Sequence, residues 1–348
     1  MKLLDTTIRD GSYSIDFKWT HEDVESILTK IQSLGFEYIE IGHGLGLNAS
    51  SAEHGYSLLS DLEYMKIANR KLSKSKFGFF CIPGIARLED LDIAKDNGVG
   101  FVRVGVNATN PDLAVPYVKK AKSLGLETMT NFMKSYAVTP DSFSDAVKIV
   151  SESGADVVYL VDSAGYMVPA EIEKYYRTVV QKNSGIQLGF HGHNNIGLAV
   201  SNSIKCADLG FDFIDCTLQG LGRSIGNAPS EQLIMALLRS GYNLDIDIPC
   251  LLEWGYDSLK DVNEKKNMHP LDLICGYTGF HSSYLKYIYK CVSEKHVDPL
   301  RLIIEYTKKN IVTMDYDELL KVADTMKKDN DENPYSFRKY FSEVFNDN

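Results

Sequence analysis

A repeated strand–helix pattern constrains the fold of this chain more than any other feature. At intervals of roughly 30 residues, a helical stretch ends in glycine and a short apolar run follows, as in LDIAKDNGVGFVRVGV and VKIVSESGADVVYLVD. These glycines stand just past a helix end, where a positive φ is needed, and they are Gly35, Gly98, Gly125, Gly154 and Gly210. The apolar runs are nearly continuous rather than alternating, which is typical of parallel strands covered by helices.

The pattern predicts eight strands, at residues 3–6, 38–41, 77–82, 101–106, 127–132, 157–161, 187–190 and 213–217. Eight strand–helix units in about 240 residues match a (β/α)8 TIM barrel in number and size. A doubly wound open sheet is the alternative. That fold usually has fewer strands and a glycine-rich phosphate loop after the first strand, where this chain has Arg9, Asp10 and Gly11 instead.

The strand–helix pattern stops after residue 247. Segments 271–292, 297–308 and 315–328 have helical patterns, and the polar final segment is expected to fray. The sequence therefore predicts an α/β chain with a TIM-barrel catalytic domain at 1–247 and a helical C-terminal domain at 248–348. No Ser/Gly linker separates the two, so we expect them to pack together.

Composition excludes several classes of function. The chain of 348 residues has a formal net charge of −10, which would repel a phosphate backbone, so we expect no nucleic-acid binding. No apolar run approaches the roughly 18 residues of a membrane helix, and charges interrupt the first residues too early for a signal peptide. Six cysteines occur without a CxxC pair, which favours free thiols and a cytoplasmic location.

The strongest local signal for chemistry is the pair His191 and His193 at the end of the seventh predicted strand. Residues i and i+2 of a strand point to the same side, so both imidazoles can bind one cation. In a closed barrel the first strand neighbours the last one, and Asp10 would add a carboxylate ligand beside Arg9. This mixture suits a divalent ion such as Mn²⁺, Mg²⁺, Co²⁺ or Zn²⁺. A bare HxH pair is more often packing, but its place at a strand end favours the metal.

Several motifs together resemble a known family. LDTTIRDGS, IEIGHGLGLNASS, LVDSAGYM, GFHGHNNIGLAVSNS and GLGRSIGNAP occur in order and are similar to those of the DRE-type TIM-barrel metallolyases. Within that superfamily the chain most resembles the 4-hydroxy-2-oxovalerate (4-hydroxy-2-oxoacid) aldolase family. The segment LICGYTGFHSSYLKYIYK resembles the C-terminal communication domain of those aldolases.

The resemblance implies an aldolase, a carbon–carbon lyase that cleaves a 4-hydroxy-2-oxoacid to pyruvate and an aldehyde with Mn²⁺ or a similar ion. Carried over by position, Asp10, His191 and His193 would bind the metal. Arg9 would stabilise the enolate, and Ser163 would lie beside the substrate, which Asp10 and His191 would also contact. An arginine is always protonated and so suits a developing oxyanion.

The chain departs from the family at the residues that would transfer the proton. The family has a catalytic histidine directly after RDGS, where this chain has Tyr13, and a tyrosine in the C-terminal motif, where this chain has His281. Histidine is a better base at neutral pH than tyrosine. We therefore hypothesise that His281 accepts the C4 hydroxyl proton and that Tyr13 is its hydrogen-bond partner. The alternative is that both positions changed because the substrate or the reaction changed.

Two other functions stay open at this point. One is a Claisen-type acyl transfer by a barrel of the same superfamily, and the other is a non-catalytic barrel subunit. The resemblance also implies an acylating aldehyde dehydrogenase as a partner, and homodimerisation through the C-terminal helices is expected.

Overall fold

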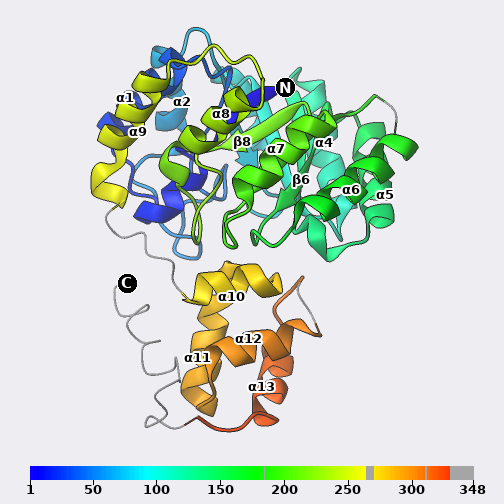
Figure 1. Cartoon of the computed structure of the whole chain (residues 1–348). Helices are drawn as coiled ribbons and strands as arrows, with labels where there is room; N and C mark the ends of the chain where they lie inside the picture. The colour runs from blue at the N-terminus through cyan, green and yellow to red at the C-terminus, as the bar shows by residue number, and fades with distance from the viewer. Residues whose placement is uncertain (184, 264–269, 310–311, 330–348) are drawn as a thin grey trace.

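The computed structural model describes the chain except for residues 184, 264–269, 310–311 and 330–348. A large unit of strands and helices forms one part of the molecule, and a smaller bundle of helices lies against one end of it (Figure 1). The polar final segment, which we expected to fray, lies outside the described residues.

The large unit is a closed barrel in which the described residues form eight parallel strands in sequential order. They are β1 Lys2–Asp5, β2 Tyr38–Ile41, β3 Lys76–Cys81, β4 Phe101–Asn107, β5 Glu127–Met133, β6 Val157–Asp162, β7 Gln187–Gly192 and β8 Phe213–Cys216. Pairing of β1 with β8, for example Leu4 with Asp215, closes the barrel. The predicted TIM barrel is confirmed, and the open sheet is excluded.

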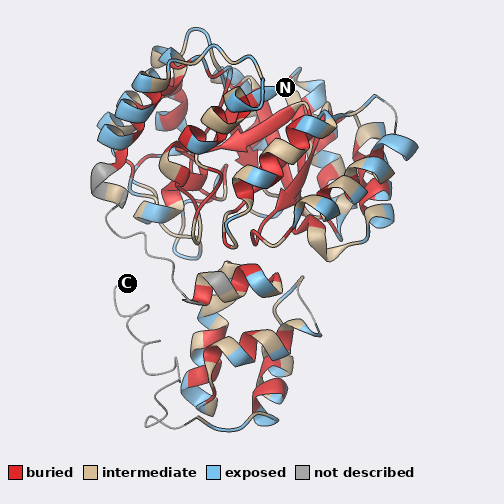
Figure 2. Cartoon of the chain, viewed as in Figure 1, coloured by how far each residue is buried: buried red, intermediate tan, exposed pale blue. Residues whose placement is uncertain are grey.

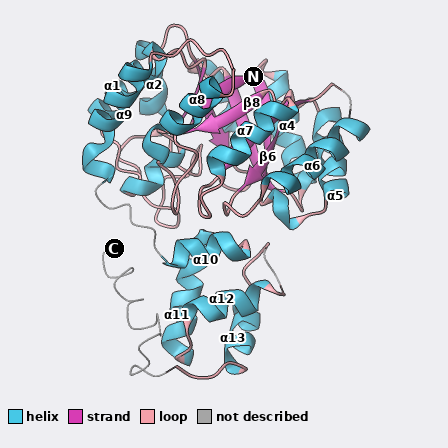
Figure 3. Ribbon diagram, viewed as in Figure 1, coloured by secondary structure: helices cyan, strands magenta, loops and turns pink. Residues whose placement is uncertain are grey.

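Helices surround the strands on the outside (Figure 3). They are α1 His21–Ser33, α2 Asp61–Lys71, α3 Leu88–Asp96, α4 Val115–Ser123, α5 Pro140–Glu152, α6 Pro169–Lys182, α7 Ala199–Leu209 and α8 Ser230–Arg239. The predicted helix-ending glycines adopt positive φ, between +70° at Gly125 and +106° at Gly154. The residue just after an α-helix often needs this left-handed backbone conformation.

Two apolar layers hold the barrel together. A small cluster that includes Leu4, Phe101, Tyr159 and Phe213 fills the barrel interior, and a much larger one packs the outer faces of the strands against the helices. Burial is therefore concentrated at the centre of this unit, whereas the outer faces of the helices are exposed (Figure 2). This packing makes the barrel a rigid frame for side chains at the strand ends.

Helix α9, Ile248–Asn263, belongs to the core of the barrel. Its Leu251 and Leu259 are fully buried in the large cluster, and the helix contacts α1 and α8. The expected division at residue 247 grouped this helix with the C-terminal domain instead. We therefore propose that the boundary between the two units lies between α9 and α10.

The smaller unit contains α10 Pro270–Thr278, α11 Leu285–Lys295, α12 Pro299–Thr307 and α13 Tyr316–Asp324, with an apolar core of its own. The helical pattern at 271–292 corresponds to two helices, because the chain breaks at Gly279 (φ +72°) and turns through a short 3-10 helix, Ser282–Tyr284, before α11 begins. This break matters because it places His281 in the turn rather than on a helix face.

All six cysteines lie in the described part of the chain and are free thiols, as predicted. None of the described helices is both long enough and apolar enough to cross a lipid bilayer.

Candidate metal centre

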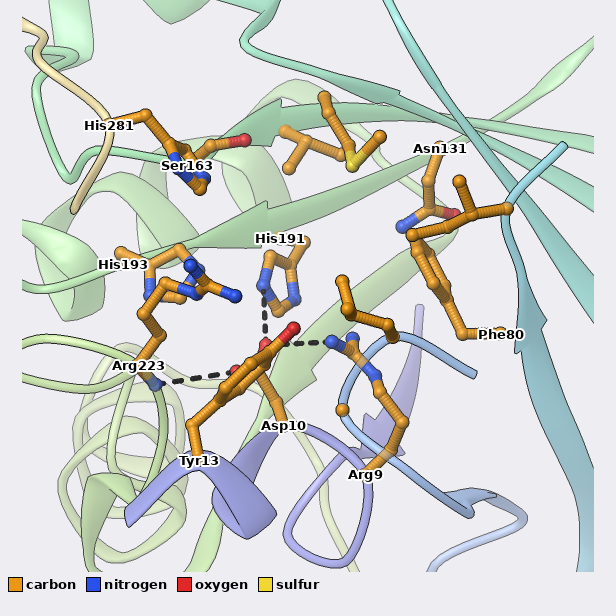
Figure 4. A pocket seen from close by; sticks show the side chains of 15 residues that line it. Arg9, Asp10, Tyr13, Phe80, Asn131, Ser163, His191, His193, Arg223 and His281 are labelled. Carbon is orange, nitrogen blue, oxygen red and sulfur yellow. Dashed lines mark hydrogen bonds and ion pairs between the residues drawn. The ribbon is translucent and has the colours of Figure 1, made fainter. Parts of the chain in front are cut away.

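The three predicted metal ligands come together at the carboxyl ends of the strands. Asp10 opens the 3-10 helix Asp10–Ile15 shortly after β1, His191 lies in β7, and His193 follows that strand. Their side chains converge in one pocket (Figure 4). All three are buried, and their candidate ligand atoms lie within 4.8 Å of one another. Asp10 Oδ2 and His191 Nε2 are 3.2 Å apart, a spacing that one shared cation would satisfy.

Arg9 is held between two carboxylates. Its Nη1 donates to Asp10 Oδ2 at 3.0 Å, and its Nε donates to Glu40 Oε2 at 2.7 Å. Burial opposes the charge of Arg9, but Glu40 and Asp10 outweigh it and raise the pKa of Arg9 above its ordinary value. The guanidinium is therefore charged and fixed in position beside the three ligands.

His191 is oriented by a carboxylate behind it. Its Nδ1 lies 2.8 Å from Asp215 Oδ2, which also accepts from Arg103 Nη2 at 2.6 Å. Burial raises the pKa of Asp215, but the nearby Arg103 and His191 lower it below its ordinary value, so the ionised carboxylate can only accept. One proton of His191 therefore sits on Nδ1. Burial lowers the pKa of His191, but Asp10 and Asp215 raise it above its ordinary value, which favours a second proton on Nε2 that a bound cation would replace. Carboxylate–histidine–metal sites use this arrangement.

Arg103 connects the carboxylate that holds Arg9 with the carboxylate that holds His191. It is fully buried, and its Nη1 donates to Glu40 Oε2 at 3.0 Å. The hydrogen bonds and ion pairs thus form a closed ring through Asp10, Arg9, Glu40, Arg103, Asp215 and His191. Each carboxylate in the ring faces a cation or an imidazole, which is how buried charges are tolerated.

The protonation states of the ligands favour cation binding. Burial raises the pKa of Asp10, but Arg9 and the two histidines hold it well below its ordinary value. Burial lowers the pKa of His193 to about 4, which keeps this imidazole neutral at physiological pH. Its Nδ1 is buried and has no hydrogen-bond partner within the described residues. The neutral imidazole of His193 with its orphaned nitrogen, the imidazole of His191 oriented by Asp215, and the ionised carboxylate of Asp10 fit a divalent metal ion.

The pocket beside the ligands encloses about 500 Å³ of space that is continuous with the solvent. Its lining includes the predicted residues Tyr13, Ser163 and His281. Ser163 Oγ accepts a hydrogen bond from the backbone N–H of Lys134 at 2.9 Å, which fixes this hydroxyl at the end of β6. Every residue that the sequence assigned to the site therefore borders one cavity.

Tyr13 and His281 share the pocket, but no hydrogen bond joins them in the described part of the chain, so this part of the hypothesis has no support. Instead, His281 Nδ1 accepts a hydrogen bond from the Ser283 backbone N–H at 3.3 Å and lies 2.7 Å from Ser283 Oγ. Tyr13 lies beneath the guanidinium of Arg223, which is 4.1 Å from the ring centroid.

Sequence reasoning missed several residues of the site. Arg223 lines the pocket from the loop after β8, and its backbone N–H donates to Asp10 Oδ1 at 3.4 Å. Asp215 was also missed, although a charged residue inside the apolar strand FIDC is a visible signal. Asn131 and Lys134 come from the end of β5, where the sequence shows no motif.

Known proteins share this architecture. The HMGL-like family matches residues 1–255. The chain belongs to the HMGL-like family. A 4-hydroxy-2-oxovalerate aldolase of Moorella thermoacetica is 31% identical over 322 residues, which is 92% of this chain and 95% of the relative. The family membership predicted from the motifs is thereby confirmed.

One further relative and one solved structure are also similar to this chain. An oxaloacetate decarboxylase of Mycobacterium tuberculosis is 35% identical over 287 residues, covering 82% of this chain and 84% of the relative. The carboxyl transferase domain of Rhizobium etli pyruvate carboxylase has a TM-score of 0.75 and 13% identity, covering 93% of this chain and 60% of that one. The last similarity shows the fold alone.

Proposed function

We propose that this chain is a divalent-metal-dependent aldolase, a lyase that interconverts a 4-hydroxy-2-oxoacid with pyruvate and an aldehyde. The observation that carries the proposal is the convergence of Asp10, His191 and His193 beside the ordered guanidinium of Arg9. Relatives named 4-hydroxy-2-oxovalerate aldolase, which align over more than nine-tenths of the chain, support it.

Asp10, His191 and His193 would hold the metal, and we propose Mn²⁺, with Mg²⁺, Co²⁺ and Zn²⁺ as alternatives. Two nitrogens and one oxygen leave coordination positions for a bidentate 2-oxoacid. When bound, such an ion would act as a Lewis acid on the 2-oxo group. Analysis of the metal content of the purified protein would distinguish the ions.

Arg9 would stabilise the charge that develops when the C3–C4 bond breaks. Retro-aldol cleavage leaves an electron pair on C3, which delocalises onto the 2-oxo oxygen as an enolate. A guanidinium already fixed by Asp10 and Glu40 needs no reorganisation to donate to that oxygen. Ser163, held by the Lys134 amide, would lie beside the same substrate.

His281 would accept the proton of the C4 hydroxyl. Burial and then the cations Arg223 and Lys134 hold its pKa well below its ordinary value, so the ring is neutral at physiological pH. In the structure Nδ1 accepts from the Ser283 N–H, so for Nε2 to act as the base the ring proton must move to Nδ1, where Ser283 Oγ at 2.7 Å is a suitable acceptor for it. Tyr13 would then shape the pocket rather than remove the proton.

The test is cleavage of 4-hydroxy-2-oxovalerate by the full-length chain, first stripped of metal and then reloaded with Mn²⁺. We expect release of pyruvate, detected with lactate dehydrogenase, from the reloaded protein alone. Equal turnover by the stripped protein would overturn the metal dependence. Release of free CoA from acetyl-CoA and a 2-oxoacid would support Claisen chemistry instead. A protein that binds no metal and exchanges no C3 deuterium of pyruvate would be a non-catalytic subunit.

Decarboxylation of oxaloacetate is a second candidate, favoured by Tyr13 at the position where the family has a catalytic histidine. Loss of CO₂ also leaves the electron pair on C3 of pyruvate, but no hydroxyl proton has to be removed. The relative named oxaloacetate decarboxylase supports this alternative. In His281→Ala, decarboxylation should persist while aldol cleavage falls. An equal loss of both activities would contradict the idea that only aldol cleavage needs His281 as a base.

We also propose, on the resemblance alone, a homodimer and an acylating aldehyde dehydrogenase as partner. Light scattering of the purified chain and co-purification with a co-expressed dehydrogenase would test these assemblies separately.

A further inference from the structure

Asn131 lines the pocket and presents a hydrogen-bond donor to it. The metal ligands, Tyr13 and His281 do not accept from this donor. Asn131 lies in β5, is only 2% exposed, and lines the cavity together with apolar neighbours such as Phe80, Met133 and Val161. A polar group that lines a cavity and has no protein partner there is free to bond to whatever occupies the cavity.

The orientation of the Asn131 amide follows from its partner. Arg103 Nε lies 3.2 Å from Asn131 Oδ1, and a guanidinium has donors only. The side-chain oxygen must therefore face Arg103, and the NH₂ group must face away from it. Arg103 cannot turn to relax this constraint, because its other nitrogens donate to Glu40 and Asp215 and its guanidinium stacks 4.2 Å from the centroid of the Tyr159 ring.

The amide nitrogen consequently points into the cavity, as Figure 4 shows, with the oxygen on the far side. Within the described residues, no group accepts a hydrogen bond from Asn131 Nδ2. β5 stands across the barrel from β1, which leads to Asp10 and Arg9. A small anion bound at the ligands would thus have Arg9 on one side and the Asn131 amide on another.

We propose that Asn131 is a substrate-binding residue whose Nδ2 donates to an oxygen of the bound 2-oxoacid. This inference rests on the proposed function, because it takes the 2-oxoacid as the occupant of the pocket. The closed ring of charges around Arg103 then has a second role. It orients the metal ligand His191 and Arg9 and also turns the Asn131 amide toward the substrate.

The experiment measures binding of oxalate, a planar dicarboxylate, to the full-length Mn²⁺-loaded protein by calorimetry. In Asn131→Ala we expect the Kd of oxalate to rise about 10-fold or more, the loss typical of a hydrogen bond to a charged group. The affinity for Mn²⁺ should change by less than about 2-fold, because Asn131 contacts no metal ligand. Asn131→Asp, which preserves side-chain shape but replaces the donor by an acceptor, should weaken oxalate at least as much.

Thr130→Val is the matched control. Thr130 is the preceding residue of β5, is fully buried, points to the other side of the strand, and its hydroxyl has no partner in the described part of the chain. The oxalate affinity of the Thr130→Val protein should equal that of the wild type.

Unchanged oxalate affinity in both Asn131 variants would overturn the assignment and leave the proposed function intact. A matching fall in Mn²⁺ affinity would also overturn it, because Asn131 would then act only through the ring of charges. A wild-type protein that binds Mn²⁺ but no oxalate would overturn the proposed function, and the assignment of Asn131 with it.

Discussion

At the scale of single residues, two buried arginines decide how the site is held. Arg9 faces the ligands directly, whereas Arg103 acts from behind them through Glu40 and Asp215. Removing one member of such a ring leaves a buried charge without its partner, which costs more than the lost contact itself. Substitutions in the ring should therefore change metal binding as well as stability.

Asp215→Asn tests the second contact of His191, which we propose as a metal ligand. The amide presents no negative charge to Nδ1–H and no longer fixes the tautomer, so we expect divalent-metal affinity to fall about 10- to 100-fold. Titration with Mn²⁺ by calorimetry would measure it. Asp208→Asn, at an exposed carboxylate that bonds Tyr242, is the control. Unaltered affinity in Asp215→Asn would show that Asp215 does not tune the ligand.

His281→Ala tests the proposed base. Turnover of 4-hydroxy-2-oxovalerate should fall about 100-fold or more, as is typical when a general base is removed, whereas Tyr13→Phe should lose less. Both variants should retain Mn²⁺, because neither side chain is among the ligands. Near-normal cleavage by His281→Ala would refute its role.

At the scale of elements, the C-terminal helices matter because they bring His281 to the barrel. Lys134, at the end of β5, crosses between the two units: its Nζ donates to Tyr284 Oη at 2.7 Å and to the Val312 carbonyl at 2.8 Å. Burial and then Arg223 lower the pKa of Lys134 to about 8. Burial of a lysine ammonium is tolerated only where hydrogen-bond acceptors compensate for the lost water. These two hydrogen bonds therefore link the smaller unit to the barrel.

Lys134→Met keeps the length of the side chain and removes its donors. We expect faster hydrogen exchange in the 3-10 helix Ser282–Tyr284 and in α11, and a turnover lower by about 10-fold, with Mn²⁺ affinity preserved. Lys120→Met, which removes an ion pair with Asp92 on the surface, should show neither change. Exchange rates identical to those of the wild type would mean that other contacts dock the helices.

The elements also show where sequence reasoning succeeds. The eight strands and the convergence of Asp10 with His191 were predictable, because apolar runs mark buried strands and a closed barrel brings its strand ends together. The placement of α9 was not, because an amphipathic helix does not reveal which core it faces. Nor was Asn131, because its role depends on the direction of one amide, which only its contact with Arg103 determines.

At the scale of the whole molecule, Asp5 makes the free energy of unfolding of the barrel depend on pH. It is fully buried, and burial raises its pKa from 3.8 to about 7, against the opposing hydrogen bonds from Thr7. Below about pH 4 the carboxyl is protonated in both the folded and the unfolded chain, and no cost arises. As the pH rises toward 7 the unfolded chain releases this proton and the folded chain keeps it, so stability falls across that window.

Asp5→Asn should remove this dependence. Between pH 4 and pH 7 the free energy of unfolding of the wild type should fall relative to that of the variant by roughly 2 to 4 kcal/mol, at 1.36 kcal/mol per pH unit. Urea unfolding followed by near-ultraviolet circular dichroism at both pH values would measure the difference. Parallel pH profiles for the two proteins would contradict the assignment to Asp5.

Closure of the barrel has a consequence for the order of events during folding. Asp10 follows the first strand and His191 lies in the seventh, and β1 reaches β7 only through β8. A nascent chain that has just emerged with its first six strands holds one carboxylate and neither imidazole. All three proposed ligands can therefore surround one cation only after β1 and β8 have paired and closed the barrel.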